Sequence, residues 1–250
     1  MESLSGKIAL VTGSGRGLGK GIALVLAEKG VDIIINSLTE NDSVRDVVRS
    51  IRAMGRKCSY IQADVSSEEQ VREMFETINE EFGGLDILVN NAGTDRSQDI
   101  FDTSLSDWEF IMKTNITSCF LCSKYAMEIM KGRKGGNIIN VSSVVGHQGA
   151  LKGHVHYSSS KSGMFGLAKA LARTGAPFGI RVNSIAPGVI ETELSRATHG
   201  DEGMKKLSDS IPLGLGNTRD VGLSVAFLCG EGGRYITGST LDINGGLYFR

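Results

Sequence analysis

Short runs of aliphatic and β-branched residues alternate with longer amphipathic segments along almost the whole chain. Seven short runs predict buried strands at residues 7–12, 31–36, 58–63, 85–90, 137–142, 180–185 and 240–243. Apolar residues three and four apart predict helices between them, among others at 19–29, 44–54, 68–82, 115–131 and 158–174. Because strands that alternate with helices pair in parallel through right-handed crossovers, we expect an α/β fold of the Rossmann type, with a doubly wound sheet covered by helices on both faces.

The pattern runs without a linker, an internal repeat or a low-complexity segment through all 250 residues. This length suits one α/β domain, so residues 1–250 are expected to form a single domain. The stretch from about 191 to 212 differs because it is polar and contains Gly200 and Gly203, with a short apolar helical core near residues 204–207. We interpret it as a mobile flap over the carboxyl edge of the sheet.

Charge and hydropathy exclude several kinds of partner. Lys and Arg number 27 against 28 Asp and Glu, which predicts no nucleic-acid partner and no anionic membrane surface. No apolar run approaches the ~18 residues of a membrane span, and the amino terminus lacks the long apolar core of a signal peptide, so we expect a cytoplasmic location.

The four cysteines show no disulfide pattern, although Cys119 and Cys122 form a C-x-x-C pair. This pair is either a redox or metal-binding half-site or two small apolar residues on a buried helix. We favour the second interpretation and predict no metal site, because no other cysteine pair or histidine cluster completes one.

A glycine-rich turn follows the first predicted strand and opens the first predicted helix. Its spacing is Gly13-x-x-x-Gly17-x-Gly19, with Gly15 and Arg16 between, and the stricter G-x-G-x-x-G spacing is absent. Backbone N–H groups in such a turn approach a pyrophosphate, and the helix amino terminus adds partial positive charge. Its position after strand one favours a dinucleotide site.

The end of the second predicted strand indicates which dinucleotide binds. NAD sites often place a carboxylate there to hold the ribose hydroxyl, whereas this strand ends in Asn36 and Ser37. The Arg16 guanidinium is suited to a ribose 2′-phosphate, so the sequence favours NADP. NAD remains the alternative, because Glu40 or Asp42 could fold back to the ribose.

Candidate reacting groups follow the fifth predicted strand. Ser143 comes directly after it, and Tyr157 and Lys161 are four residues apart on the next predicted helix and therefore share a face. A phenol with a pKa of about 10 is a poor acid–base group at neutral pH. A nearby ammonium, together with the positive charge of an oxidised nicotinamide, stabilises the phenolate, so we expect Lys161 and the cofactor to lower the pKa of Tyr157.

Taken together, these motifs resemble the short-chain dehydrogenase/reductase family over nearly the whole chain. The matching residues are Thr12, Gly13, Gly17, Gly19, Asp64, Val65, Asn90, Asn91, Ala92, Gly93, Asn115, Ser143, Tyr157, Lys161, Pro187, Gly188 and Thr192. The resemblance implies a seven-stranded parallel sheet, usually in a homotetramer. It also implies an enzyme that transfers hydride between NAD(P)(H) and a carbonyl or secondary alcohol.

The resemblance implies roles for the catalytic residues. Tyr157 would be the general acid in reduction and the base in oxidation, and Ser143 would hydrogen-bond the substrate oxygen. Lys161 would lower the Tyr157 pKa and bind the nicotinamide ribose, and Asn115 would hold a water that links Lys161 to solvent. The neighbouring Ser142 faces the other way on the extended chain, so we interpret it as structural.

The same resemblance implies the cofactor contacts. Asp64 and Val65 would meet the adenine, Asn91 and Gly93 would line the dinucleotide, and Ile190 and Thr192 would seat the carboxamide. The full expected set is Gly13, Gly15, Arg16, Gly17, Leu18, Gly19, Asn36, Ser37, Asp64, Val65, Asn91, Ala92, Gly93, Tyr157, Lys161, Pro187, Gly188, Ile190 and Thr192.

The substrate is less constrained than the reaction. The segments around residues 139–146 and 235–238 look most like 3-oxoacyl-[acyl-carrier-protein] reductases, in which cations near the site meet the acidic carrier protein. Arg133 and Lys134 could serve at one such place, but Phe178 stands where a second cation is expected.

Two alternatives to the acyl substrate stay open. Three histidines lie in the segment before the catalytic tyrosine: His147, His154 and His156. They either hydrogen-bond a polyol or carboxylate substrate or are ordinary polar loop residues. A sugar or polyol dehydrogenase of the same family is therefore the main alternative. A non-catalytic dinucleotide sensor or scaffold is disfavoured, because all four catalytic residues are present.

Overall fold

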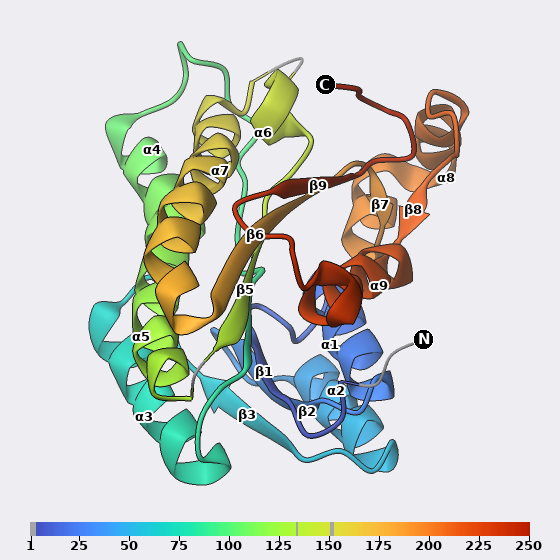
Figure 1. Ribbon diagram of the computed structural model, residues 1–250. Coiled ribbons are helices and arrows are strands. Elements are labelled where there is room, and N and C mark those ends of the chain that lie inside the picture. The colour runs from blue at the N-terminus through green and yellow to red at the C-terminus, as the bar shows by residue number, and fades with distance from the viewer. Residues whose placement is uncertain (1–3, 134, 151–152) are drawn as a thin grey trace.

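A parallel sheet forms the centre of the computed structural model, which describes residues 4–133, 135–150 and 153–250 (Figure 1). Within these residues the sheet has seven strands in the order β3-β2-β1-β4-β5-β6-β9, and each neighbouring pair runs parallel. The strands are β1 (Ile8–Val11), β2 (Asp32–Ser37), β3 (Cys58–Gln62), β4 (Ile87–Asn90), β5 (Gly136–Val141), β6 (Ile180–Pro187) and β9 (Thr240–Ile243). The predicted doubly wound α/β fold is thus confirmed.

Helices cover both faces of the sheet (Figure 1). One face carries α1 (Gly17–Glu28), α2 (Asp42–Ala53) and α9 (Thr218–Cys229), and the other carries α3 (Glu68–Phe82), α4 (Leu105–Met112), α5 (Ser118–Gly132) and α7 (Val155–Gly175). Near the carboxyl edge lie α6 (Val145–Gln148), α8 (Glu193–Asp209) and the short pair β7 (Ile190–Glu191) and β8 (Gly216–Asn217). None of the described helices is long and apolar enough to cross a bilayer.

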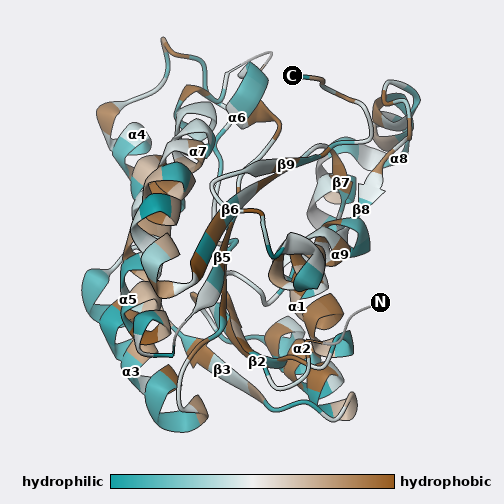
Figure 2. Ribbon diagram, in the orientation of Figure 1, coloured by the Kyte–Doolittle hydropathy of each residue, from teal (hydrophilic) through white to brown (hydrophobic). Residues whose placement is uncertain are grey.

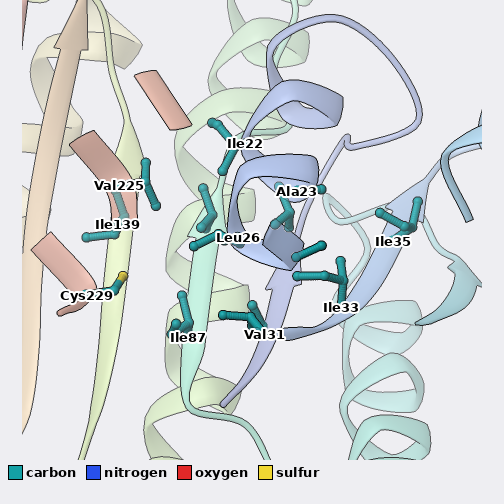
Figure 3. Packing of buried hydrophobic residues seen from close by; sticks show 14 of the residues in the cluster. Ile22, Ala23, Leu26, Val31, Ile33, Ile35, Ile87, Ile139, Val225 and Cys229 are labelled. Carbon is teal, nitrogen blue, oxygen red and sulfur yellow. The ribbon is translucent and has the colours of Figure 1, made fainter. Parts of the chain in front are cut away.

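The core follows from the alternation of side chains along the strands. Ala9 and Val11 of β1 belong to one buried cluster, whereas Leu10 between them belongs to the cluster on the opposite face. Figure 3 shows the first cluster, in which Ile22 and Leu26 of α1 pack over the sheet. The strands are largely hydrophobic and the outer surface of α3 is hydrophilic (Figure 2), as two covered faces require.

The helix predicted at 115–131 starts earlier and is interrupted. Ser104 caps α4, where its hydroxyl accepts a hydrogen bond from Asp107 N at 3.1 Å. A π-helical turn, η1 (Lys113–Thr117), then leads into α5. The sequence did not indicate α4 because Leu105 is exposed and only Ile111 of that helix is buried, which leaves almost no apolar periodicity.

The segment predicted as a flap contains much more helix than expected. Instead of a short core near residues 204–207, α8 extends from Glu193 to Asp209, with a non-helical residue at Gly200. Thr192 and Ser195 form a capping box that starts it, since the Thr192 hydroxyl accepts from Ser195 N at 3.1 Å. Among the side chains of α8 that the structure describes, only Met204 is buried, so the apolar pattern indicated only the second half of the helix.

Candidate active site

Three adjoining cavities lie outside the carboxyl ends of the strands, where ligands bind in open α/β sheets. The central cavity of about 580 Å³ extends from the glycine turn to Tyr157. The β2 cavity of about 520 Å³ shares Arg16, Asn91 and Gly93 with it and continues to the tip of β2. The side cavity of about 340 Å³ shares Asp95 and Tyr157 with the central cavity.

The glycine turn leaves room for a phosphate beside the amino terminus of α1. Gly13 has a φ of 62°, and a Cβ there would lie 2.9 Å from Ala92 Cα. Gly17 has a φ of 55°, and nothing lies within 4 Å of the place where its Cβ would stand. No side chain caps α1, so its first N–H groups remain available on the side that Gly17, Leu18 and Gly19 present to the central cavity.

The chain after β4 holds the glycine turn in place. Asn91 Nδ2 donates to Thr12 O at 2.8 Å and Gly13 O at 3.1 Å. In return, the Thr12 hydroxyl accepts from the backbone N–H groups of Asn91 and Ala92, each at 3.0 Å. The Asn91 amide therefore supports the turn, while Asn91 and Gly93 line the central cavity.

Both polar atoms of the Asn36 side chain, at the tip of β2, are hydrogen-bonded within the protein. This residue is buried, and its Oδ1 accepts from Gly13 N at 3.3 Å while its Nδ2 donates to Ile61 O and Ala63 O. The Ser37 hydroxyl donates to Thr39 O at 2.7 Å. Asn36 thus connects β2, β3 and the turn, although it and Ser37 still border the β2 cavity.

Arg16 is the free cation at the junction of the central and β2 cavities. It is exposed and borders both, and within the described residues nothing hydrogen-bonds or pairs with its side chain. Glu40 and Asp42 do not fold back to the cavity, because both pair with Arg45, at 3.3 and 2.6 Å. Asp64 borders the β2 cavity, but its Oδ1 accepts from Ser66 N; Val65 also lines this cavity.

Ser143, Tyr157 and Lys161 meet at the inner end of the central cavity, as the sequence predicted. Ser143 follows β5, and its hydroxyl lowers the pKa of the neighbouring Tyr157 phenol. Lys161 lies one turn after Tyr157 on α7, with its Nζ 5.5 Å from the centre of the tyrosine ring. Ser142 is structural, as expected, because its hydroxyl donates to Lys161 O at 2.7 Å.

In the protein without cofactor, the pKa of Tyr157 is raised. Burial and, to a smaller extent, the Asp95 carboxylate raise it to about 12, and only the hydrogen bond with Ser143 opposes them. Lys161 does not lower it in the protein alone, because its ammonium donates instead to Val141 O at 2.8 Å. Burial also lowers the pKa of Lys161 to about 8, against the influence of Cys119 and Asp95.

Asn115 lies in the π-helical turn η1 and is fully buried. Its Nδ2 donates to Thr94 O at 2.9 Å and Ser160 Oγ at 3.0 Å, and its Oδ1 accepts from Thr94 N at 2.8 Å. The side chain therefore ties the loop after β4 to α7. Such turns are frequent at functional sites, and the only sequence signal for it was a run of poor helix formers, Thr114 to Thr117.

The remaining predicted cofactor residues line the same cavity as Tyr157. Pro187 ends β6, and Gly188 and Ile190 follow it along the wall of the central cavity. Thr192 also borders this cavity, where its hydroxyl caps α8.

The three histidines have different surroundings. His147 stacks on Phe165 at 4.2 Å between ring centres, with its Nε2 3.0 Å from Asp242 Oδ1. His156 is completely buried, and its Nδ1 accepts from Tyr157 N at 2.8 Å. Both are structural.

Only His154 among these histidines borders a cavity of the site. Its Nδ1 lies 2.7 Å from Oδ2 of Asp95 in an ion-pair contact whose angle does not satisfy a hydrogen bond. Asp95 was not predicted as a site residue, although it stands as an acidic residue two positions after the Asn-Asn-Ala-Gly loop.

The residues considered for carrier-protein docking and for metal or redox chemistry contribute little to the cavities. Arg133 folds back, since its guanidinium donates to Gly83 O at 2.9 Å and lies 3.5 Å from Asp86. Lys134 lies outside the described residues. Cys119 and Cys122 are free, buried residues of α5, which confirms the apolar interpretation of the C-x-x-C pair. The described residues contain no cluster of three metal-ligating side chains.

Comparisons with known proteins agree with this geometry. Residues 13–248 match the family described as enoyl-(acyl carrier protein) reductase. The chain is 39% identical over 247 residues to the 3-oxoacyl-[acyl-carrier-protein] reductase FabG of Vibrio cholerae, covering 98% of this chain and 99% of that protein. It is 40% identical over 247 residues to the Aquifex aeolicus protein of the same name, with 98% of each covered.

Solved structures give the same result. A Sinorhizobium meliloti protein described as a short-chain alcohol dehydrogenase superimposes with a TM-score of 0.92 at 36% identity, over 98% of this chain and 97% of that one. A short-chain type dehydrogenase/reductase from Mycobacterium marinum gives 0.90 at 35% identity, over 99% and 97%.

Proposed function

Since the chain belongs to the short-chain dehydrogenase/reductase family and is an oxidoreductase of that family, we propose that it reduces the 3-oxo group of an acyl thioester with NADPH. The observation that carries this proposal is the convergence of Ser143, Tyr157 and Lys161 on a cavity that continues to the glycine turn. We take residues 1–250 as one cofactor-binding domain. The two 3-oxoacyl-[acyl-carrier-protein] reductases support the thioester.

The proposed chemistry uses the side chains where they lie. A bound nicotinamide dinucleotide supplies the hydride in reduction and accepts it in oxidation. The substrate carbonyl oxygen sits between the hydroxyls of Ser143 and Tyr157, and Tyr157 donates its proton to the oxygen as negative charge develops there. The raised pKa keeps Tyr157 protonated at neutral pH before the substrate binds. Lys161 contributes positive charge below its pKa of about 8.

The residues present fit a dinucleotide along the central and β2 cavities. The uncapped amino terminus of α1 and the open space over Gly17 suit the pyrophosphate. The tip of β2 presents Asn36 in place of a carboxylate, and Arg16 is free beside it. Glu40 and Asp42 are engaged by Arg45 and do not line the β2 cavity, and we propose that NADP is preferred.

Replacing Arg16 by Ala is expected to weaken NADPH binding by about tenfold or more and NADH binding much less. A charge-assisted pair with the 2′-phosphate would be lost, and NADH has no such phosphate. Fluorescence titration of the purified protein with both cofactors measures the effect. Arg49→Ala is the control, since Arg49 is an exposed arginine that pairs with Asp46 and borders neither cavity. Equal losses for the two cofactors would exclude 2′-phosphate recognition by Arg16.

Turnover assays test the substrate. We expect NADPH consumption with acetoacetyl thioesters, on a small carrier such as coenzyme A and on an acyl carrier protein. A clear preference for the carrier protein would establish it as a partner; docking would need a cation other than Arg133, which is held by Gly83 and Asp86. NADPH binding without reduction of any ketone would contradict the proposal and favour a sensor or scaffold. A homotetramer and a cytoplasmic location stay predictions.

A further inference from the structure

The side cavity places a carboxylate and an imidazole next to the reacting tyrosine. Its wall includes Asp95, His154 and Tyr157, and both Asp95 and Tyr157 also border the central cavity. A substrate whose carbonyl oxygen meets Tyr157 therefore has its neighbouring carbon close to Asp95. Neither Asp95 nor His154 has a place in the hydride-transfer chemistry above.

The pair is held by the backbone of two loops. The N–H of His154 donates to Gln98 O at 2.8 Å, which joins the start of α7 to the loop after β4. His154 has a φ of 60°, a left-handed conformation that is uncommon outside glycine and several-fold enriched in His, Asn and Asp. A Cβ on the preceding Gly153 would lie 2.9 Å from Gln98 O, so the two loops are in close contact. The chain thus fixes the carboxylate and the imidazole against each other.

The described residues that complete the wall of the side cavity are Val145, Gln148, Gly149 and Ala150. A long acyl chain entering here would remove solvent from the Asp95 carboxylate without replacing its hydrogen bonds. An anionic substituent would be repelled by the same carboxylate. A hydroxyl group, in contrast, can donate to Asp95 and accept from His154.

We propose that Asp95 and His154 form a hydroxyl-recognition subsite, which selects carbonyl substrates that carry a hydroxyl on the carbon next to the carbonyl. This inference rests on the proposed hydride transfer at Tyr157 and adds short, hydroxylated ketones to the substrates of the same site. Discrimination arises because a substrate without the hydroxyl displaces water from the Asp95 and His154 side chains, which are 35% and 28% exposed, without replacing its hydrogen bonds.

Two ketones of equal size test the subsite. Hydroxyacetone and 2-butanone differ only in a hydroxyl or a methyl group on the carbon beside the carbonyl. With NADPH, we expect the unaltered protein to show kcat/KM at least about tenfold higher for hydroxyacetone. Asp95→Ala should reduce this ratio about tenfold, mainly through a higher KM for hydroxyacetone. His154→Asn, which tolerates the same backbone conformation, should reduce it in the same direction.

The controls separate recognition from other effects. Asp99→Asn removes an acidic group from the same loop but outside the side cavity, and should leave the ratio unchanged. If Asp95→Ala does not fold, Asp95→Asn replaces it. An equal loss with both ketones would show that Asp95 acts only on the pKa of Tyr157, and an unaltered ratio or a preference for 2-butanone would also overturn the subsite.

The thioester assay distinguishes failure of the subsite from failure of the proposed function. Reduction of acetoacetyl thioesters without any preference for hydroxyacetone would overturn the subsite and leave hydride transfer intact. No reduction of the thioesters or of either ketone, with NADPH bound, would overturn the proposed function and the subsite together.

Discussion

Replacing Tyr157 by Phe is expected to lower kcat by at least about a hundredfold and to leave the affinity for NADPH nearly unchanged. The change removes one oxygen, the only group that can donate a proton to the substrate oxygen from this side of the cavity in our proposal, and general acids typically contribute about 10²–10⁴-fold to rate. The ring and its packing remain. Single-turnover reduction and fluorescence titration measure the two quantities separately.

A matched variant makes this result interpretable. Tyr125→Phe removes a phenol from α5 that hydrogen-bonds Glu68 at 3.3 Å and borders none of the three cavities. It should turn over normally. Turnover of Tyr157→Phe within a few-fold of the unaltered protein would mean that another group, or water, supplies the proton, and the assignment of Tyr157 as general acid would be wrong.

The features predicted from the sequence are those that local pattern determines. Buried parallel strands must be apolar on both faces, so runs such as Ile33 to Ile35 were recognisable without any tertiary information. The four-residue spacing of Tyr157 and Lys161 likewise sets their common face on α7. The order of the strands was not predicted, because no residue pattern encodes which parallel strands become neighbours.

The features that the sequence did not predict depend on contacts between distant segments. Burial and Asp95 determine that the pKa of Tyr157 is raised. Asp95 is 62 positions away along the chain and comes close to the tyrosine only in the folded protein. The role of Asn36 as a connector of β2, β3 and the glycine turn is also visible only in three dimensions. Polar residues at a strand tip look alike in sequence whether they bind a ligand or the backbone.

Replacing Lys161 by Met should have the second large effect, and it should appear in both rate and stability. Loss of the ammonium removes the positive charge near Tyr157 and the proposed ribose contact, so we expect kcat to fall at least about a hundredfold and NADPH affinity to weaken. Unchanged cofactor affinity would contradict the ribose role. Lys169→Met is the control, because Lys169 is an exposed lysine on the same helix.

The stabilities of the unaltered protein and of Lys161→Met should differ increasingly as the pH rises, and the lowered pKa of Lys161 determines which of the two gains. Burial lowers the pKa of Lys161 from 10.5 to about 8, so between these values the unfolded chain holds a proton that the folded protein has released. Stability therefore rises with pH in this window, by at most about 3 kcal/mol at about 1.36 kcal/mol for each pH unit, and the burial penalty is fully present below pH 8.

This rise should be missing from Lys161→Met and retained in Lys169→Met. Urea unfolding at about pH 7 and about pH 10, on either side of the folded pKa, measures it as the change in the free-energy difference between variant and unaltered protein. Other groups that titrate in this range, including the buried cysteines, are common to all three proteins and largely cancel. The absolute stability of Lys161→Met at neutral pH is less informative, because two effects oppose each other. The variant no longer carries the cost of burying the ammonium, but Val141 O loses its hydrogen-bond donor. The pH dependence of the free-energy difference, in contrast, reports on the proton of Lys161 alone. If the free-energy difference between Lys161→Met and the unaltered protein stays constant across this range, the pKa of Lys161 is not lowered by burial in the folded protein.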